Sequence, residues 1–108
     1  MIALLVAAPL CRANDFPTAG RVEFVLECMR DHAGGQFELL SKCSCVIDRL
    51  AQKYKFDAFV EAQTLGKGVT IAGERGSTLR DNEQAQQAAR KYRDAVAAAS
   101  RACFLPEK

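Results

Sequence analysis

The chain has 108 residues, a length that fits a single domain. Hydrophobic residues make up 49% and charged residues 26%, a balance that is typical of globular proteins and excludes a disordered chain. The net charge of +2 is too small to indicate nucleic-acid binding. No apolar run reaches the about 18–20 residues that a membrane-spanning helix needs.

The first ten residues, MIALLVAAPL, are apolar and uncharged, and Cys11-Arg12-Ala13 follows them. This pattern is typical of a secretory signal that is cleaved after Ala13. The basic residues that usually precede such a segment are missing, so either the start codon is assigned too late or the signal is weak. We predict a signal peptide over 1–13, a single helical domain over 14–108 and a periplasmic location.

Hydrophobic periodicity predicts a first helix that has Thr18 as its N-cap. This helix is expected to end at Gly34-Gly35. Its apolar face consists of Val22, Val25, Leu26 and Met29. A second helix is predicted over about 36–55, with an apolar stripe of Leu39, Leu40, Cys43, Val46, Ile47, Leu50 and Tyr54.

A third, short helix is predicted from Asp57 to about Gly66, and a glycine-containing loop over 67–80 follows it, in which 69–71 could be extended. The last predicted helix is capped by Asp81, with Gln84 as its capping-box partner, and runs to about Cys103. One of its faces carries Ala85, Ala88, Ala89, Tyr92, Val96, Ala99 and Cys103. The expected fold is an all-α compact bundle of about four helices.

Four cysteines would remain after removal of Cys11, namely Cys28, Cys43, Cys45 and Cys103. An even number of cysteines in a small exported domain predicts a disulfide framework, here of two bonds. Cys43 and Cys45 lie on one helix, and their side chains point about 200° apart at about 100° per residue. They therefore need partners on opposite sides, which makes the second helix the central one.

The turn between the first two helices favours one pairing. Cys28 and Cys43 are roughly equally far from Gly34-Gly35, so they should face each other across the hairpin. That pairs Cys45 with Cys103, although the swapped pairing also fits if the hairpin slips by one residue.

Other roles for the cysteines have weaker support. Haem attachment needs a C-x-x-C-H motif, whereas the chain has Cys43-Ser44-Cys45, so no haem is expected. A Cu(I) site that includes Met29 and His32 is a chemical alternative, because thiolates and thioethers suit this ion. A thiol oxidoreductase is disfavoured, because activated cysteines lie near helix N-termini, whereas Cys43 and Cys45 lie in the middle of the predicted second helix.

Carboxylates recur at helical spacing in two places. Glu23, Glu27 and Asp31 follow one another at intervals of four on the first helix, and Asp57 and Glu61 form a second pair. Hard cations bind to several carboxylate oxygens at once. These five residues are the candidate ligands for a metal ion, and a solvated helix face is the alternative interpretation.

His32 is the one histidine of the chain. Its position just before Gly34 predicts an interaction with the last carbonyls of the first helix rather than a role as a catalytic base. No Ser-His-Asp set, phosphate-binding loop or zinc-ligand spacing is present. With the four cysteines in disulfides, no obvious nucleophile is left, so we predict that the protein is not an enzyme.

Several short segments resemble those of a group of small periplasmic proteins. They are Pro17-Thr18-Ala19, VEFVLECM ending at Met29, Cys43-Ser44-Cys45 with Ile47-Asp48, Gly73-Glu74-Arg75-Gly76, Leu79-Arg80-Asp81 and Arg101-Ala102-Cys103-Phe104. The chain is similar here to LanD-like proteins of methylotrophic bacteria, which accompany quinoprotein alcohol dehydrogenases and rare-earth uptake genes. The resemblance implies a non-enzymatic accessory protein that binds a trivalent lanthanide and passes it to a partner.

The resemblance does not assign individual ligands. The expected ion is a lanthanide or calcium, and the expected partner is a periplasmic dehydrogenase, metal-binding protein or transporter. Two copies that share one ion would form a metal-bridged homodimer. The alternative hypothesis is a disulfide-stapled adaptor that binds a partner through an exposed helix face and needs no metal.

Overall fold

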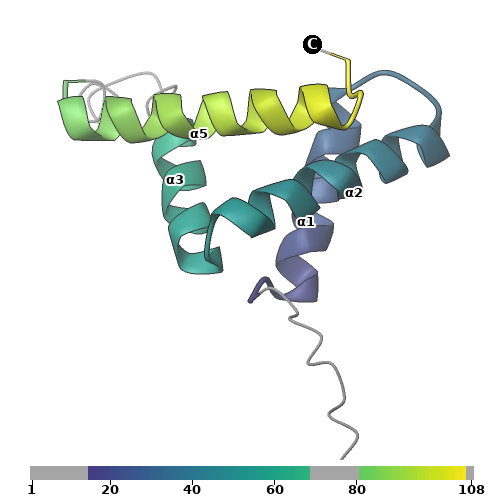
Figure 1. The fold of residues 1–108 in the computed structure, drawn as a ribbon, viewed down its shortest axis with the longest axis horizontal. Coiled ribbons are helices and arrows are strands. Elements are labelled where there is room, and N and C mark those ends of the chain that lie inside the picture. The colour runs from purple at the N-terminus through teal and green to yellow at the C-terminus, as the bar shows by residue number, and fades with distance from the viewer. Residues whose placement is uncertain (1–14, 69–80, 107–108) are drawn as a thin grey trace, which may run out of the picture.

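The computed structural model describes residues 15–68 and 81–106, and these residues form an all-α bundle (Figure 1). Its helices are α1 (Thr18–Asp31), α2 (Gln36–Lys53), α3 (Phe56–Gly68) and α5 (Glu83–Ala102). The predicted fold class is confirmed. The predicted signal peptide and the candidate extended residues 69–71 lie outside the described residues.

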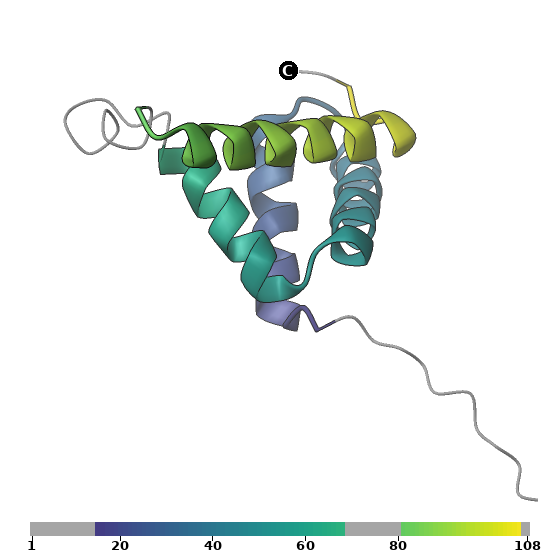
Figure 2. The same cartoon turned by 60° about the vertical axis from the view of Figure 1, so that its left-hand side comes forward.

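Helix α2 is the central element of the bundle, because it contacts α1, α3 and α5. Helix α5 lies across one side of the other helices, which both views show (Figures 1 and 2). Helices α1 and α3 meet through side chains, such as the rings of Phe24 and Phe59 with centroids 6.0 Å apart. The predicted central position of the second helix is confirmed.

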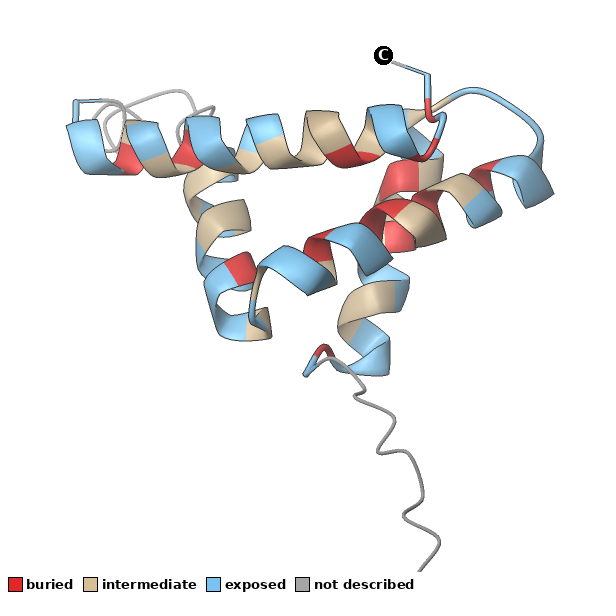
Figure 3. Ribbon diagram, viewed as in Figure 1, coloured by how far each residue is buried: buried red, intermediate tan, exposed pale blue. Residues whose placement is uncertain are grey.

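The core follows the predicted stripe of α2. Leu39, Val46 and Ile47 are buried, and Cys43 and Leu50 have no exposed surface. The buried positions of α2 and α5 face the interior of the bundle (Figure 3). Alanines on the buried face of α5 have small side chains that allow close packing against the neighbouring helices. Burial of this apolar surface is the main force that holds the helices together.

Two disulfides join α2 to its neighbours, and both have the favoured pairing. Cys28 of α1 is bonded to Cys43, with Cα atoms 6.0 Å apart. Cys103, the C-cap residue of α5, is bonded to Cys45, with Cα atoms 5.8 Å apart. Because Cys43 and Cys45 point in different directions from α2, one bond holds α1 and the other holds the end of α5.

The first residues that the structure describes cap a distant helix. The carboxylate of Asp15 accepts hydrogen bonds from the backbone N–H of Phe56, at 3.1 and 3.2 Å, where α3 begins. Phe16 is buried, and its ring lies 5.1 Å from that of Phe59 and 5.2 Å from that of Phe56. Gly20 allows this packing, since a Cβ atom there would lie 2.9 Å from the Phe56 ring.

Two predicted helix caps are wrong. Helix α1 begins at Thr18, and the N-cap position belongs to Pro17, which has no side-chain acceptor. Helix α5 is capped by Asn82, whose side-chain oxygen accepts a hydrogen bond from the Ala85 N–H at 3.1 Å, and not by Asp81. Asn and Asp are both good N-cap residues, so the sequence alone placed the N-cap of α5 one residue too early.

The end of α5 has the hydrogen bonds of a Schellman motif, with Phe104 in the place that glycine usually takes. The Leu105 N–H donates a hydrogen bond to the Ser100 carbonyl at 2.9 Å, and the Phe104 N–H donates one to the Arg101 carbonyl at 3.2 Å. Phe104 has a φ of 59° and is 81% exposed, whereas Leu105 is buried. The reversal therefore returns Leu105 to the core beside the Cys45–Cys103 bond.

The predicted apolar face of α1 is only partly a core face. Val25 is buried, but Val22 is 49% and Leu26 is 59% exposed. The buried side of α1 instead includes Cys28, which the disulfide turns toward α2. Periodicity identified the apolar residues of this helix correctly but not the direction in which it packs.

We expect the two disulfides to stabilise the fold unequally. The Cys28–Cys43 bond closes a loop with a sequence separation of 15, and the Cys45–Cys103 bond one of 58. Loss of chain entropy in the unfolded state then predicts about 3 kcal/mol for the first and about 4 kcal/mol for the second. Denaturant unfolding of Cys28→Ala/Cys43→Ala and of Cys45→Ala/Cys103→Ala measures both values. A larger loss from the first pair than from the second would contradict the prediction.

Candidate functional site

A cleft of about 330 Å³ lies between α1, α3 and α5, with α2 beneath it. We call it the α1–α3–α5 cleft. Its nonpolar lining consists of Phe24, Cys28, Val46, Gly66, Val96 and Leu105. Its polar and charged lining consists of Glu27, Asp31, His32, Gln63, Lys67, Tyr92, Arg93 and Ser100. An apolar interior with polar groups around it is typical of sites that bind small molecules.

An ion pair joins two walls of the cleft. The Lys67 Nζ atom of α3 lies 3.2 Å from one carboxylate oxygen of Glu27 on α1 and 3.3 Å from the other. Both side chains are partly exposed, so the pair contributes little to stability. Its consequence for the site is that the Glu27 carboxylate already has a cationic partner.

Tyr92 forms the α5 wall of the cleft. Its ring packs edge-on against Phe59, with centroids 6.0 Å apart, and a Cβ atom on Gly66 would lie 3.4 Å from it. Burial, with smaller contributions from the negative charges of Glu27 and Tyr54, raises the pKa of Tyr92 to about 12, although a hydrogen bond with Gln63 acts in the opposite direction. The hydroxyl therefore stays protonated and uncharged at ordinary pH.

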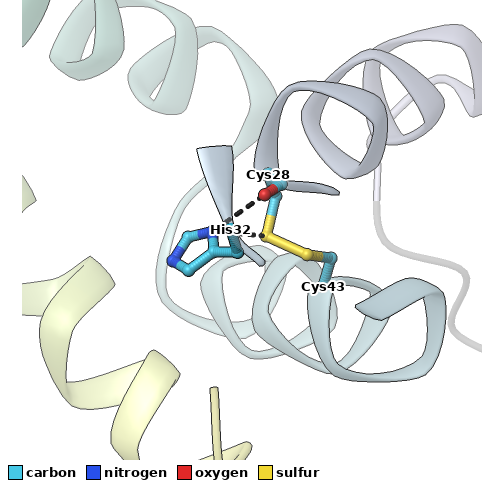
Figure 4. Close-up of a disulfide and its surroundings, with 3 residues drawn as sticks. All are labelled: Cys28, His32 and Cys43. Carbon is cyan, nitrogen blue, oxygen red and sulfur yellow. Dashed lines mark hydrogen bonds between the residues drawn. A yellow bond between two sulfur atoms is a disulfide. The ribbon is translucent and has the colours of Figure 1, made fainter. Parts of the chain in front are cut away.

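His32 is the C-cap residue of α1 and also lines the cleft. Its Nδ1 atom lies 2.8 Å from the carbonyl oxygen of Cys28, one turn earlier, and 4.0 Å from the Cys28 Sγ atom (Figure 4). Since a carbonyl only accepts hydrogen bonds, Nδ1 carries the proton in this contact. The predicted interaction of His32 with a terminal carbonyl of α1 is confirmed.

The predicted metal ligands are spread over different surfaces. Glu27 and Asp31 line the cleft, whereas Glu23 is exposed outside it, and Asp57 and Glu61 are exposed near the start of α3. At about 100° per residue, a side chain eight positions along a helix is rotated by about 80°, so Glu23 and Asp31 face different directions. Among residues 15–68 and 81–106, no group of three or more His, Cys, Asp or Glu side chains is placed to hold a metal ion.

Sequence reasoning missed five polar residues of the cleft, Gln63, Lys67, Tyr92, Arg93 and Ser100. Tyr92 was predicted to lie on the apolar face of the last helix, and its aromatic ring does pack there. Nothing in the local pattern indicates that Gln63 and Lys67 of α3 meet Tyr92 and Glu27. These contacts depend on how α3 crosses α1 and α5.

A second hollow, of about 290 Å³, runs along the other side of α1 where it packs on α2. We call it the α1–α2 groove. The exposed apolar residues Val22, Leu26 and Leu40 line it, and Leu40 is 45% exposed. Arg21 of α1 also lines the groove and forms an ion pair with Asp48 of α2. The groove thus presents an apolar surface with a charged pair at its border.

None of the described helices is both long enough and apolar enough to cross a membrane. Comparisons of the chain with protein-family models, with curated proteins and with solved structures found no match.

We expect Tyr92 to make stability depend on pH in the alkaline range. Its folded pKa of about 12 lies above the ordinary value of 10, so the folded state retains the proton more strongly than the unfolded state. This stabilisation is fully present below about pH 10 and is lost as the pH rises toward about 12. The free energy of unfolding, measured across this range, should fall less steeply in Tyr92→Phe than in the Tyr54→Phe control. Equal slopes in the two variants would contradict the prediction.

Proposed function

We propose that the protein is a non-enzymatic adaptor whose α1–α2 groove binds the apolar face of an amphipathic helix from a partner protein. The observation that carries this proposal is the exposure of Val22 and Leu26 on α1 together with Leu40 on α2. Water-exposed apolar residues that line one groove are typical of protein interaction sites. The proposal commits to a partner helix because the groove runs between two packed helices, where a third can lie.

The spacing of the exposed residues fits helix-in-groove recognition. Val22 and Leu26 are separated by one helical turn, and Leu40 faces the same groove from α2. Amphipathic helices present anchors at the same spacing of three or four residues, so their apolar side chains fit between such positions. The Arg21–Asp48 ion pair at the border would contact the polar edge of the partner helix.

The Cys28–Cys43 disulfide supports this proposal because it joins the two helices that form the walls of the groove. A covalent bond between the walls reduces the freedom that binding would otherwise have to remove. Preorganisation of this kind increases affinity without any new contact. The groove is therefore held in shape before a partner arrives.

The proposed compartment is the periplasm. Disulfides persist in oxidising environments outside the cytoplasm. The chain has two disulfides, and Cys43 of the Cys28–Cys43 bond is completely buried. The apolar N-terminal pattern of residues 1–10 independently supports export. The proposed partner is accordingly an exported protein.

Site-specific photo-crosslinking tests the adaptor function in cells that produce the protein. We expect a benzophenone amino acid at Leu26 to yield one discrete crosslinked partner, because Leu26 lines the groove. The same group at Arg90, an exposed residue of α5 outside both hollows, is the matched control and should yield none. The product should persist in the presence of a metal chelator and should disappear when Val22→Asp is added.

Four results would contradict the adaptor proposal. They are no product at Leu26, the same product at Arg90, persistence of the Leu26 product after Val22→Asp, and loss of that product on chelation. The last result would favour metal-dependent partner binding.

Hard-cation binding is our second candidate function, with a lanthanide or calcium as the ion. The observation that favours it is that two predicted ligands, Glu27 and Asp31, line the same cleft one turn apart. Lys67 already interacts with Glu27, so an ion would have to displace this ammonium group. Both carboxylates are oxygen donors of the kind that such cations bind.

Calorimetric titration with a trivalent lanthanide tests this second function. We expect Lys67→Gln to tighten binding, because it releases the Glu27 carboxylate, and Glu27→Gln to weaken it. Asp57→Asn, outside the cleft, serves as the control. Binding no tighter than that of an unrelated acidic protein, or insensitivity to both cleft variants, would exclude the cleft as a metal site.

A further inference from the structure

We propose that the α1–α3–α5 cleft binds an uncharged small molecule that has an apolar part of one or two rings and one polar end. This inference concerns a different surface from the α1–α2 groove and does not depend on the adaptor function. It is an alternative to hard-cation binding, because both would use the same cleft. It rests on the volume of the cleft, on the chemistry of its floor and on the balance of charge around it.

The floor of the cleft is apolar and large enough for rings. Phe24, Val46 and Val96 line it, and Val46 is almost completely buried beneath the opening. Its volume of about 330 Å³ falls in the range of small-molecule sites, which begins at about 300 Å³. An apolar cavity of about 150 Å³ accommodates a benzene ring, so this cleft has room for a body of two rings.

Three of the polar side chains that line the cleft, those of Gln63, Tyr92 and Ser100, are neutral. Tyr92 presents a hydroxyl that stays protonated, and Gln63 from α3 lies within hydrogen-bonding reach of it. Ser100 adds a second hydroxyl from α5. Hydroxyl and amide groups both donate and accept hydrogen bonds, so they can hold one polar end of a ligand without requiring a charge on it.

The charges of the Asp, Glu, Lys and Arg side chains that line the cleft cancel. Glu27 and Asp31 contribute two negative charges, and Lys67 and Arg93 contribute two positive ones. Glu27 and Lys67 neutralise each other directly at 3.2 Å. A ligand ion would meet no net opposite charge in the cleft while it lost its own hydration, which is costly. The cleft therefore favours an uncharged ligand over an ion of the same shape.

Both disulfides keep the cleft open to such a ligand. Cys28 is part of the lining and is bonded to Cys43, and Leu105 of the lining follows Cys103, which is bonded to Cys45. The walls formed by α1 and by the end of α5 are thus fixed to α2. The site exists before binding, so a ligand does not need to order it.

Two fluorescent probes that differ only by a sulfonate group test the proposal on the complete, oxidised protein. 1-Naphthylamine is uncharged at neutral pH and has two fused rings with one amino group as its polar end, and 8-aminonaphthalene-1-sulfonate carries one negative charge on the same two rings. We expect saturable binding of the uncharged probe with one site per chain and an affinity at least about tenfold higher than that of the sulfonate. Equal or tighter binding of the sulfonate, or no saturation by the uncharged probe, would overturn the proposal.

The location of the bound probe is established separately. In the wild-type protein, NMR shifts on addition of the uncharged probe should be largest for the amides of Gly66, Ser100 and Leu105 of the cleft. Val96→Phe fills the cleft and should reduce the affinity at least about tenfold. Leu40→Ala, the matched control in the α1–α2 groove, should leave it unchanged. Shifts confined to the groove, or loss of binding in Leu40→Ala with retention in Val96→Phe, would show that the probe does not occupy the cleft. NMR mapping requires no variant, so it decides the question even if Val96→Phe fails to fold.

Discussion

The divergence of Cys43 and Cys45 on α2 is the constraint on which the rest of the structure depends. Two side chains that lie two positions apart on a helix point in different directions, so they cannot bond with each other and must reach different neighbours. One holds α1 and the other holds the end of α5. Helix α3, which no disulfide holds, is fixed by apolar contacts and by its N-terminal cap from Asp15.

Both candidate binding surfaces follow from this arrangement. Helix α1 packs on α2 beside the groove and shares the lining of the cleft with α3 and α5, so it borders both hollows. The Cys28–Cys43 bond sits between the two surfaces, because it joins the walls of the groove and Cys28 lines the cleft. A small domain buries too little surface to hold such hollows open by packing alone, which explains the value of covalent links here.

Sequence patterns predicted the helices of this fold better than they predicted which side of each helix is buried. The helices, the central position of α2 and the favoured disulfide pairing are confirmed, because they depend on local periodicity and on the angle between successive side chains. The packing side of α1 was wrong. Apolar spacing shows which residues share a face, but Val22 and Leu26 are exposed, whereas Cys28 on another side of the helix is buried. The predicted carboxylate stripe likewise divides between solvent and cleft, because it winds around α1.

The sequence by itself determined which segments are helical and which cysteines cannot pair with each other. These properties follow from interactions between residues that are close in the chain. Only the tertiary structure decided that Glu27 meets Lys67, that Tyr92 faces Gln63 and that Asp15 caps α3. Partners 40 and 41 residues apart are brought together by the angles at which helices cross. Those angles result from the packing of the whole core around α2. No local sequence pattern describes this packing, because it involves side chains from all the helices at once.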